Sequence, residues 1–201
     1  DRVATIVEKR LRRFGVNDIS PEEFFPEDKD QELLIRKIGE EYKQKFDSGE
    51  GRGYHRHDDA YRYARPDYIK SLAGESKSSH TYNYAGFDQL VHLSSGIIRY
   101  FLESAHQMFP DTKSKYPGKK KITFIPPGIQ NEKVKEEAHK FLFDHLEKLA
   151  KEGEEEKAPP KEDLRKLFNL IEALGGMFRQ ILLSDRSERR VFSIAFSDKP
   201  N

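Results

Sequence analysis

The stretch that decides the fold runs Leu93-Ser94-Ser95-Gly96-Ile97-Ile98-Arg99-Tyr100-Phe101-Leu102. Apolar residues resume at helical spacing after the glycine, and we predict that a serine caps the new helix. Gly96 would let another backbone approach the helix start, and Arg99 falls in the first turn. Because a helix N-terminus offers free N–H groups, an arginine beside it makes a natural anion site. The alternative is a solvated arginine on an amphipathic helix.

Helical patterns also fill the sequence before this stretch. The first apolar stripe, ended by Gly15, consists of Val3, Val7, Leu11 and Phe14. Ser20-Pro21-Glu22-Glu23 is typical of a capped helix start. A second start at Asp28 to Gln31 precedes a stripe of Leu34, Ile38, Tyr42 and Phe46. From Ser48 to His80 the apolar period is lost, which predicts a long loop with one short helix at Pro66 to Leu72.

After Leu102 the pattern predicts helices and then a hairpin. Pro110 is expected to end the helix that carries Arg99, and a basic turn spans Tyr116 to Lys121. The next helix, 131–150, has an expected inner face of Val134, Ala138, Phe141, Leu142, His145 and Leu149. A further helix, marked by Leu164, Leu167, Phe168, Ile171 and Leu174, should stop at Gly175-Gly176. Two apolar runs, Met177 to Ser184 and Arg190 to Ser197, then predict a β-hairpin.

These elements predict a mainly α fold with a small α/β part. The expected division is a helical domain over residues 1–128 and a winged-helix-like segment over 129–201, with a charged linker at about 151–160. Since no initiator Met precedes Asp1 and no closing element follows Lys199, both ends are expected to be cut from a longer chain.

Composition narrows the function classes. The 201 residues carry 36 basic and 35 acidic side chains, so the net charge of +1 excludes a globally basic nucleic-acid binder. The chain has no Cys, which excludes disulfides and thiolate metal sites and fits a reducing cytoplasm. No apolar run approaches the roughly 20 residues that a membrane span needs.

Self-contained catalytic motifs are absent from the sequence. No Gly-x-x-x-x-Gly-Lys-Ser/Thr is present, and Gly49 to Gly53 lacks the lysine and reads as linker. The cluster His55-x-His57-Asp58-Asp59 has no distant partner that would complete a metal site, so we predict no metal. The aromatic and basic residues from Tyr54 to Tyr63 could stack on bases, but packing of the tyrosines against the protein is the favoured interpretation. We therefore expect no catalytic centre within this chain.

The run Ser-Ser-Gly-x-x-Arg followed by an apolar helix resembles the sensor-2 helix in the lid of AAA+ ATPases. More narrowly, the chain resembles bacterial ATPases similar to the origin-recognition and replication-licensing group. Other pieces that carry this resemblance are Arg65-Pro66-Asp67-Tyr68, Tyr84-Ala85-Gly86-Phe87, Phe124-Ile125-Pro126-Pro127-Gly128-Ile129-Gln130 and Ser187-Glu188-Arg189-Arg190-Val191-Phe192-Ser193-Ile194. Together they span most of the chain after about residue 60.

The resemblance implies a lid and winged-helix segment whose P-loop domain lies upstream. Arg99 matches the residue that reaches the γ-phosphate, with Ser95 and Gly96 beside it. The implied cofactor is ATP with Mg²⁺, held only together with the upstream domain, and the implied role is to relay nucleotide state to DNA or to a protein. The whole nucleotide-binding core of the family is missing from this sequence.

Basic residues supply a second candidate site. The predicted hairpin and its neighbourhood contain Arg179, Arg186, Arg189 and Arg190, and the basic turn contains Lys119, Lys120 and Lys121. Such residues would contact the phosphates of DNA, although a solvated hairpin in a protein-binding module is the alternative.

Three functions remain open from the sequence. The first is the lid of a P-loop ATPase, with an upstream nucleotide-binding domain and DNA, a protein or further copies of the chain as partners. The second is a free-standing DNA- or protein-binding module with no nucleotide role. The third is a signalling ATPase that binds a partner protein and no DNA.

Overall fold

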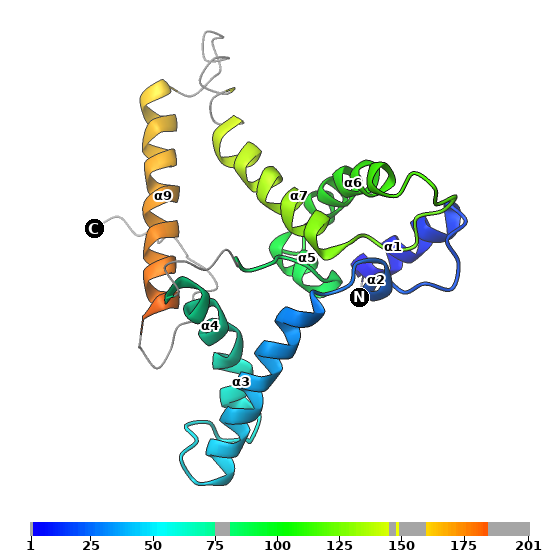
Figure 1. The fold of residues 1–201 in the computed structure, drawn as a ribbon. Helices are drawn as coiled ribbons and strands as arrows, with labels where there is room; N and C mark the ends of the chain where they lie inside the picture. Colours follow the sequence, from blue (N-terminus) through cyan, green and yellow to red (C-terminus); the bar gives the residue numbers. More distant parts are fainter. Residues whose placement is uncertain (1, 75–80, 145–147, 149–159, 185–201) are drawn as a thin grey trace. The chain divides into compact units, whose positions relative to one another are not determined.

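The computed structural model describes residues 2–74, 81–144, 148 and 160–184. Within these residues every regular element is a helix, so the predicted mainly α fold is confirmed (Figure 1). The elements in chain order are α1 (Arg2–Arg13), α2 (Pro21–Phe24), α3 (Lys29–Asp47), α4 (Asp58–Gly74), α5 (Phe87–Leu93), α6 (Ile98–Lys115), α7 (Pro127–His139), the π-helical turn η1 (Lys140–Asp144) and α9 (Lys161–Leu183).

Contacts between Cα atoms divide the chain into two compact units. Unit 1 comprises residues 1–32 and 82–161, and unit 2 comprises 33–81 and 162–201. The predicted domain boundary at 128/129 does not coincide with this division, because α7 packs against α6 inside unit 1. The predicted linker at 151–160 lies outside the described residues, except for Pro160.

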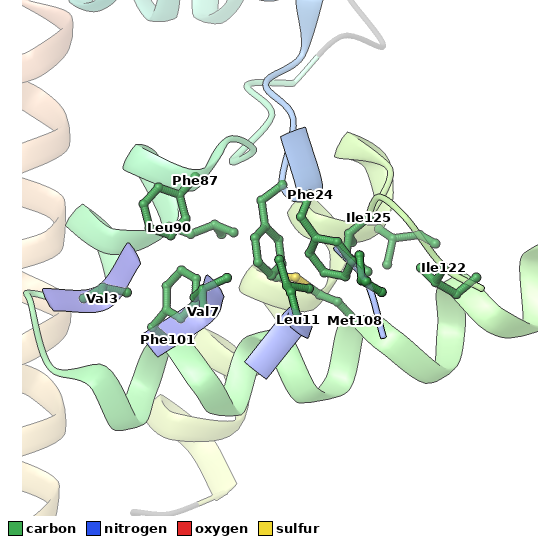
Figure 2. Packing of buried hydrophobic residues seen from close by; sticks show 13 residues of the cluster. Val3, Val7, Leu11, Phe24, Phe87, Leu90, Phe101, Met108, Ile122 and Ile125 are labelled. Carbon is green, nitrogen blue, oxygen red and sulfur yellow. The ribbon is translucent and has the colours of Figure 1, made fainter. Parts of the chain in front are cut away.

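The core of unit 1 gathers apolar side chains from five helices and from three connecting segments. Figure 2 shows Val7 and Leu11 of α1 facing Phe24, Phe101 and Met108. The ring of Phe101 contacts two others edge-on, with centroid distances of 5.6 Å to Phe25 and 5.7 Å to Phe87. Two backbone hydrogen bonds tie the segments together: Phe87 N donates to Phe25 O and Ile125 N donates to Phe24 O.

The predicted helix ends of α1 and α2 are largely confirmed. Gly15 has a φ of +72°, and Val16 N donates to Leu11 O at 2.9 Å, which is the hydrogen bond of a left-handed helix stop. This turn directs Val16 into the core and leaves Phe14 76% exposed, so the prediction that Phe14 faces inward is wrong. Ser20 and Glu23 form the predicted capping box at the start of α2.

Unit 2 is built on the pairing of α3 with α4. Of the predicted stripe of α3, Ile38, Tyr42 and Phe46 are half-buried, whereas Leu34 is 45% exposed and its neighbour Ile35 is buried instead. An added Cβ at Gly39 would lie 3.7 and 3.8 Å from the Cβ atoms of Ala60 and Ala64, so the two helices approach closely. The ring of Tyr42 packs beside that of Tyr63, and its hydroxyl donates to Asp67.

Two predicted boundaries are wrong. The short helix expected at Pro66 to Leu72 is the end of a longer helix, α4, which begins at Asp58. Small residues supply part of its packing face, so the sequence of its first turns shows no period of large apolar residues. Pro110 does not end α6, because Met108 and Thr112 on either side of it are buried in the core. Packing of this face outweighs the hydrogen bond that the proline ring removes.

The carboxy-terminal elements differ most from expectation. α9 continues through Gly175-Gly176 to Leu183, so the predicted first strand of the hairpin, Met177 to Ser184, is helical up to Leu183. Its apolar residues recur every three or four positions, and this helical period decides against a strand. The predicted turn at 185–188 and the second strand at 190–197 lie outside the described residues. On the 131–150 helix, Ala138 and Phe141 are exposed, while Val134 packs against the core as predicted.

Candidate functional site

The α5–α6 junction holds the three residues predicted to sense a nucleotide. Ser94 ends α5: its hydroxyl donates to Val91 O at 2.7 Å and its N–H to Leu90 O at 3.0 Å. Ser95 and Gly96 then turn the chain with φ values of +52° and +71°. Ile97, in an extended conformation, is the N-cap of α6, so the prediction that a serine caps this helix is wrong. The serine oxygen is engaged by the preceding helix instead.

Arg99 lies in the first turn of α6 and is exposed. Its guanidinium forms no hydrogen bond or ion pair with any residue in the described ranges. Ser95 and Gly96 are exposed beside it, and no atom lies within 4 Å of an added Cβ at Gly96. Among the described residues no other backbone approaches Gly96, so within them the glycine is explained by its positive φ. No side chain caps the N–H groups of this helix start.

Exposed apolar side chains lie close to Arg99 along the chain, and the sequence interpretation did not assign them a role. Leu93 is 46%, Ile97 49% and Tyr100 45% exposed. The Tyr100 ring lies edge-on to that of Phe141 on η1, with centroids 6.1 Å apart, and Phe141 is 56% exposed. The sequence does contain a signal for these exposed side chains. Apolar residues stand on both sides of the Ser-Ser-Gly turn, and they are more numerous than one buried helix face requires.

Gln130 fixes the segments that carry this junction. Its side chain is fully buried: Oε1 accepts from Gly86 N at 2.9 Å, and Nε2 donates to Pro26 O at 3.0 Å and to Ile125 O at 2.8 Å. The next residue, Asn131, accepts from Tyr84 N through Oδ1. Two of the sequence pieces singled out above, Tyr84 to Phe87 and Phe124 to Gln130, are thus parts of one hydrogen-bonded clamp.

Lys133, three residues after Gln130, joins α6 to α7. Its Nζ lies 2.7 Å from Asp111 on α6 and 2.8 Å from Glu136 on α7. Hydrogen bonds to Asp111 and then to Glu136 raise the pKa of Lys133 above its ordinary value. The lysine is therefore charged throughout the neutral range, and α6 and α7 are held together by an ion pair as well as by apolar packing.

The predicted nucleic-acid residues are distributed over both units. In unit 1, Lys119 Nζ lies 5.0 Å from the ring centroid of Tyr116 and 4.7 Å from that of Phe124, while Lys121 Nζ donates to Gly15 O at 2.8 Å. Lys120 is exposed. In unit 2, Arg179 is exposed on α9. The remaining three, Arg186, Arg189 and Arg190, lie outside the described residues.

The bond from Lys121 to Gly15 adds residues that the sequence interpretation missed. It places the basic turn beside the last turn of α1, where Arg10, Arg12 and Arg13 are exposed. We call these three arginines together with Lys119, Lys120 and Lys121 the basic surface. Three arginines close together at the end of a helix indicate a basic patch in the sequence. The sequence does not show that this patch lies beside the lysines, because about a hundred residues separate the two segments.

The His55–Asp59 segment has a structural explanation. Asp58 Oδ2 accepts from His55 N at 3.0 Å and Asp59 Oδ2 from Arg52 N at 2.7 Å, so both carboxylates hold the backbone of the preceding loop. Across the described ranges, no three His, Asp or Glu side chains gather in a way that could hold a metal ion. Tyr54 and Tyr61 are 94% and 78% exposed, so the expected packing of the tyrosines applies to Tyr63 but not to these two.

Comparison with known proteins assigns a family. The family model described as ORC-CDC6-like matches residues 1–201. The chain belongs to the ORC-CDC6-like family. This membership relates it to AAA+ ATPases, as the junction around Arg99 had suggested. No curated protein and no solved structure matches the chain. None of the helices in the described part of this family member has the length and apolar character of a membrane span.

Proposed function

We propose that this ORC-CDC6-like chain is the lid portion of an AAA+ ATPase and that Arg99 senses the bound nucleotide. The observation that carries the proposal is an exposed guanidinium, without a partner in the described residues, beside an uncapped helix start. A side chain in that position has donors available for phosphate oxygens. The ATP and Mg²⁺ would be held by a nucleotide-binding domain that is not part of these residues.

The packing of α6 explains how such a contact would be relayed. Phe101 and Met108 lie on the same helix as Arg99 and are buried in the core of unit 1. Lys133 and the apolar contacts hold α6 to α7, and Gln130 holds α7 to the start of α5. A force on Arg99 would therefore move α5, α6 and α7 together, because close-packed helices shift as bodies. The partner that receives this movement is DNA or a protein.

The test compares nucleotide binding and turnover in the natural-length protein. We expect Arg99→Ala to retain ATP binding within a few-fold and to lose turnover by at least about tenfold, because an arginine on the transferred phosphate acts mainly in the transition state. Arg36→Ala, another exposed arginine on a helix, is the matched control and should leave both quantities unchanged. Equal turnover in wild type and Arg99→Ala would reject the proposal and favour a binding module without a nucleotide role.

The basic surface favours a second function, phosphate contact with nucleic acid. Its six exposed basic residues come from two segments that the bond from Lys121 to Gly15 joins, and Phe14 is exposed beside Gly15. Binding of labelled duplex DNA, followed by fluorescence anisotropy over a salt series, tests this function. Arg13→Glu with Lys120→Glu should weaken binding and flatten its salt dependence. Arg36→Glu with Lys37→Glu carries the same charge change on α3 and should not. Unchanged binding in the first double variant would leave a protein as the favoured partner.

A further inference from the structure

Phe14, just after the last turn of α1, displays an aromatic ring beside the basic surface. Its side chain is 76% exposed, whereas the other three residues of the same apolar stripe are buried, namely Val3, Val7 and Leu11. The next residue, Gly15, is fixed by the helix stop and by Lys121 Nζ, which donates to its carbonyl at 2.8 Å. The ring is therefore held outside the core by an ordered turn, so a contact with it does not require the backbone to be ordered first.

Positive charge is concentrated in both segments beside the ring. Residues 112–131 contain no Asp or Glu. The exposed lysines of that segment are Lys113, Lys115, Lys119, Lys120 and Lys121. At the end of α1, Lys9 is exposed together with the three arginines of the basic surface, and Arg12 lies 3.5 Å from Glu8 in an exposed ion pair. The segment between α6 and α7 runs past the end of α1 (Figure 1), so the two sets of cations attract the same polyanion.

Two further rings accompany the lysines. Tyr116 and Phe124 are half-buried, with ring centroids 6.0 Å apart, and Lys119 Nζ lies over both, at 5.0 Å and 4.7 Å from the centroids. Aromatic rings among cations are typical of surfaces that bind single-stranded nucleic acid, because the cations contact phosphates while the rings stack on bases. Of the three rings, that of Phe14 is the most exposed.

An exposed ring distinguishes a single strand from a duplex. Inside a duplex both faces of each base are covered by its neighbours, so a protein ring reaches a base only by prying a base step apart, which costs free energy. In a single strand the base faces are accessible, and every base can stack on an aromatic side chain. Phosphate contacts are available in both forms. The combination of cations with an exposed ring therefore favours the single strand.

We propose that the basic surface binds single-stranded nucleic acid, with the phosphates on its arginines and lysines and a base stacked on the ring of Phe14. The inference rests on the second function proposed above, phosphate contact by the basic surface. It adds the form of the nucleic acid and the side chain that recognises it.

The first test compares the affinities of the full chain for a labelled oligothymidine of about 16 nucleotides and for a duplex of the same length, measured by fluorescence anisotropy. We expect the single strand to bind more tightly. Phe14→Ala should weaken its binding at least about fivefold and leave duplex binding unchanged, because stacking is lost while the phosphate contacts remain. Phe14→Leu, which is apolar without a ring, should behave like Phe14→Ala, and Phe14→Tyr should retain the affinity. Oligouridine in place of oligothymidine shows whether DNA or RNA is the preferred strand.

Tyr54→Ala is the matched control, because Tyr54 is 94% exposed and lies in unit 2, outside the basic surface. It should leave both affinities unchanged. Single-strand binding that requires Arg13 and Lys120 but not the ring of Phe14, or tighter binding of the duplex, would overturn this inference and leave phosphate contact by the basic surface in place. Binding that survives Arg13→Glu with Lys120→Glu would reject the phosphate contact as well.

The second test observes stacking directly, and it is possible because the chain contains no tryptophan. Phe14→Trp introduces a single indole, whose emission is quenched when a base stacks on it. We expect oligothymidine to quench this emission, and heparin, a polyanion without bases, to bind with little quenching. Tyr54→Trp should show no quenching with either ligand. Unchanged emission from the Phe14→Trp protein when oligothymidine is bound would mean that the side chain at this position does not contact a base, and the proposal would fail.

Discussion

At the scale of the residue, Gln130 shows how one polar side chain holds a junction in place. It is buried in the core of unit 1, yet each of its three hydrogen bonds goes to a backbone group that has no partner within a helix. Buried backbone groups are costly when unpaired, so the amide replaces the water that these groups would otherwise need. A carboxamide is suited to this position because it both donates and accepts.

Replacement of Gln130 by leucine should therefore destabilise the protein although the new side chain is apolar. We expect Gln130→Leu to lower the free energy of unfolding by about 2 to 4 kcal/mol, since Gly86 N, Pro26 O and Ile125 O lose their partner. Urea denaturation monitored by circular dichroism measures the change. The same substitution at Gln107, which is exposed on α6, should cost less than about 0.5 kcal/mol. A similar loss of stability at both positions would mean that the hydrogen bonds of the buried Gln130 amide do not stabilise the fold.

At the scale of the element, backbone conformation decides whether a glycine stabilises or destabilises the fold. Gly96 has a φ of +71° in the α5–α6 turn, a region that L-residues with a Cβ rarely adopt. Gly176 lies inside α9, where glycine weakens a helix. Both have open space around an added Cβ, so steric clashes do not enter the comparison.

The same substitution should therefore act in opposite directions at the two sites. We expect Gly176→Ala to raise the free energy of unfolding of unit 2 by about 0.5 to 1 kcal/mol, because alanine restricts the unfolded chain and favours the helix. Gly96→Ala should lower that of unit 1 by about 1 kcal/mol through backbone strain. Thermal melts followed by circular dichroism show whether each substitution raises or lowers the stability. Stabilisation by Gly96→Ala would contradict the left-handed turn at the start of α6.

At the scale of the whole molecule, the two units have separate sets of packed side chains. Unit 1 is built on the core around Phe101 and Met108, and unit 2 on the contacts of α3 with α4. α3 connects them: its first turn is capped by Asp28, and Gln31 exchanges hydrogen bonds with Asn83 in unit 1. Its later residues belong to unit 2.

Separate cores predict separate responses to core substitutions. We expect Met108→Ala to lower the opening free energies of α6 and α7 by about 2 to 4 kcal/mol and to leave α4 unchanged. Tyr63→Ala, which removes a buried ring of unit 2, should do the reverse. Hydrogen exchange resolved by peptide distinguishes the two patterns. An equal loss of protection in α4 and α7 after either substitution would show that the chain unfolds as one cooperative unit.

Local signals determined several features from the sequence alone. These are the mainly α class, the capping box at Ser20, the stop at Gly15 and the turn before Arg99. They also led to the family, because the pattern around Arg99 depends on neighbouring residues only. Caps, turns and amphipathic stripes involve groups a few residues apart, so their energetics are contained in a short stretch of sequence.

Tertiary structure decided the rest. α4 exists because Ala60 and Ala64 fit against Gly39, α6 runs past Pro110 because Met108 and Thr112 are buried, and α9 passes through two glycines. The contact of Lys121 with Gly15 and the clamp at Gln130 join residues about a hundred positions and about forty positions apart. For α4 and α6, contacts between distant segments outweigh a local preference of about 1 to 3 kcal/mol, and no short stretch contains both partners. α9 continues through its glycines on its own apolar period.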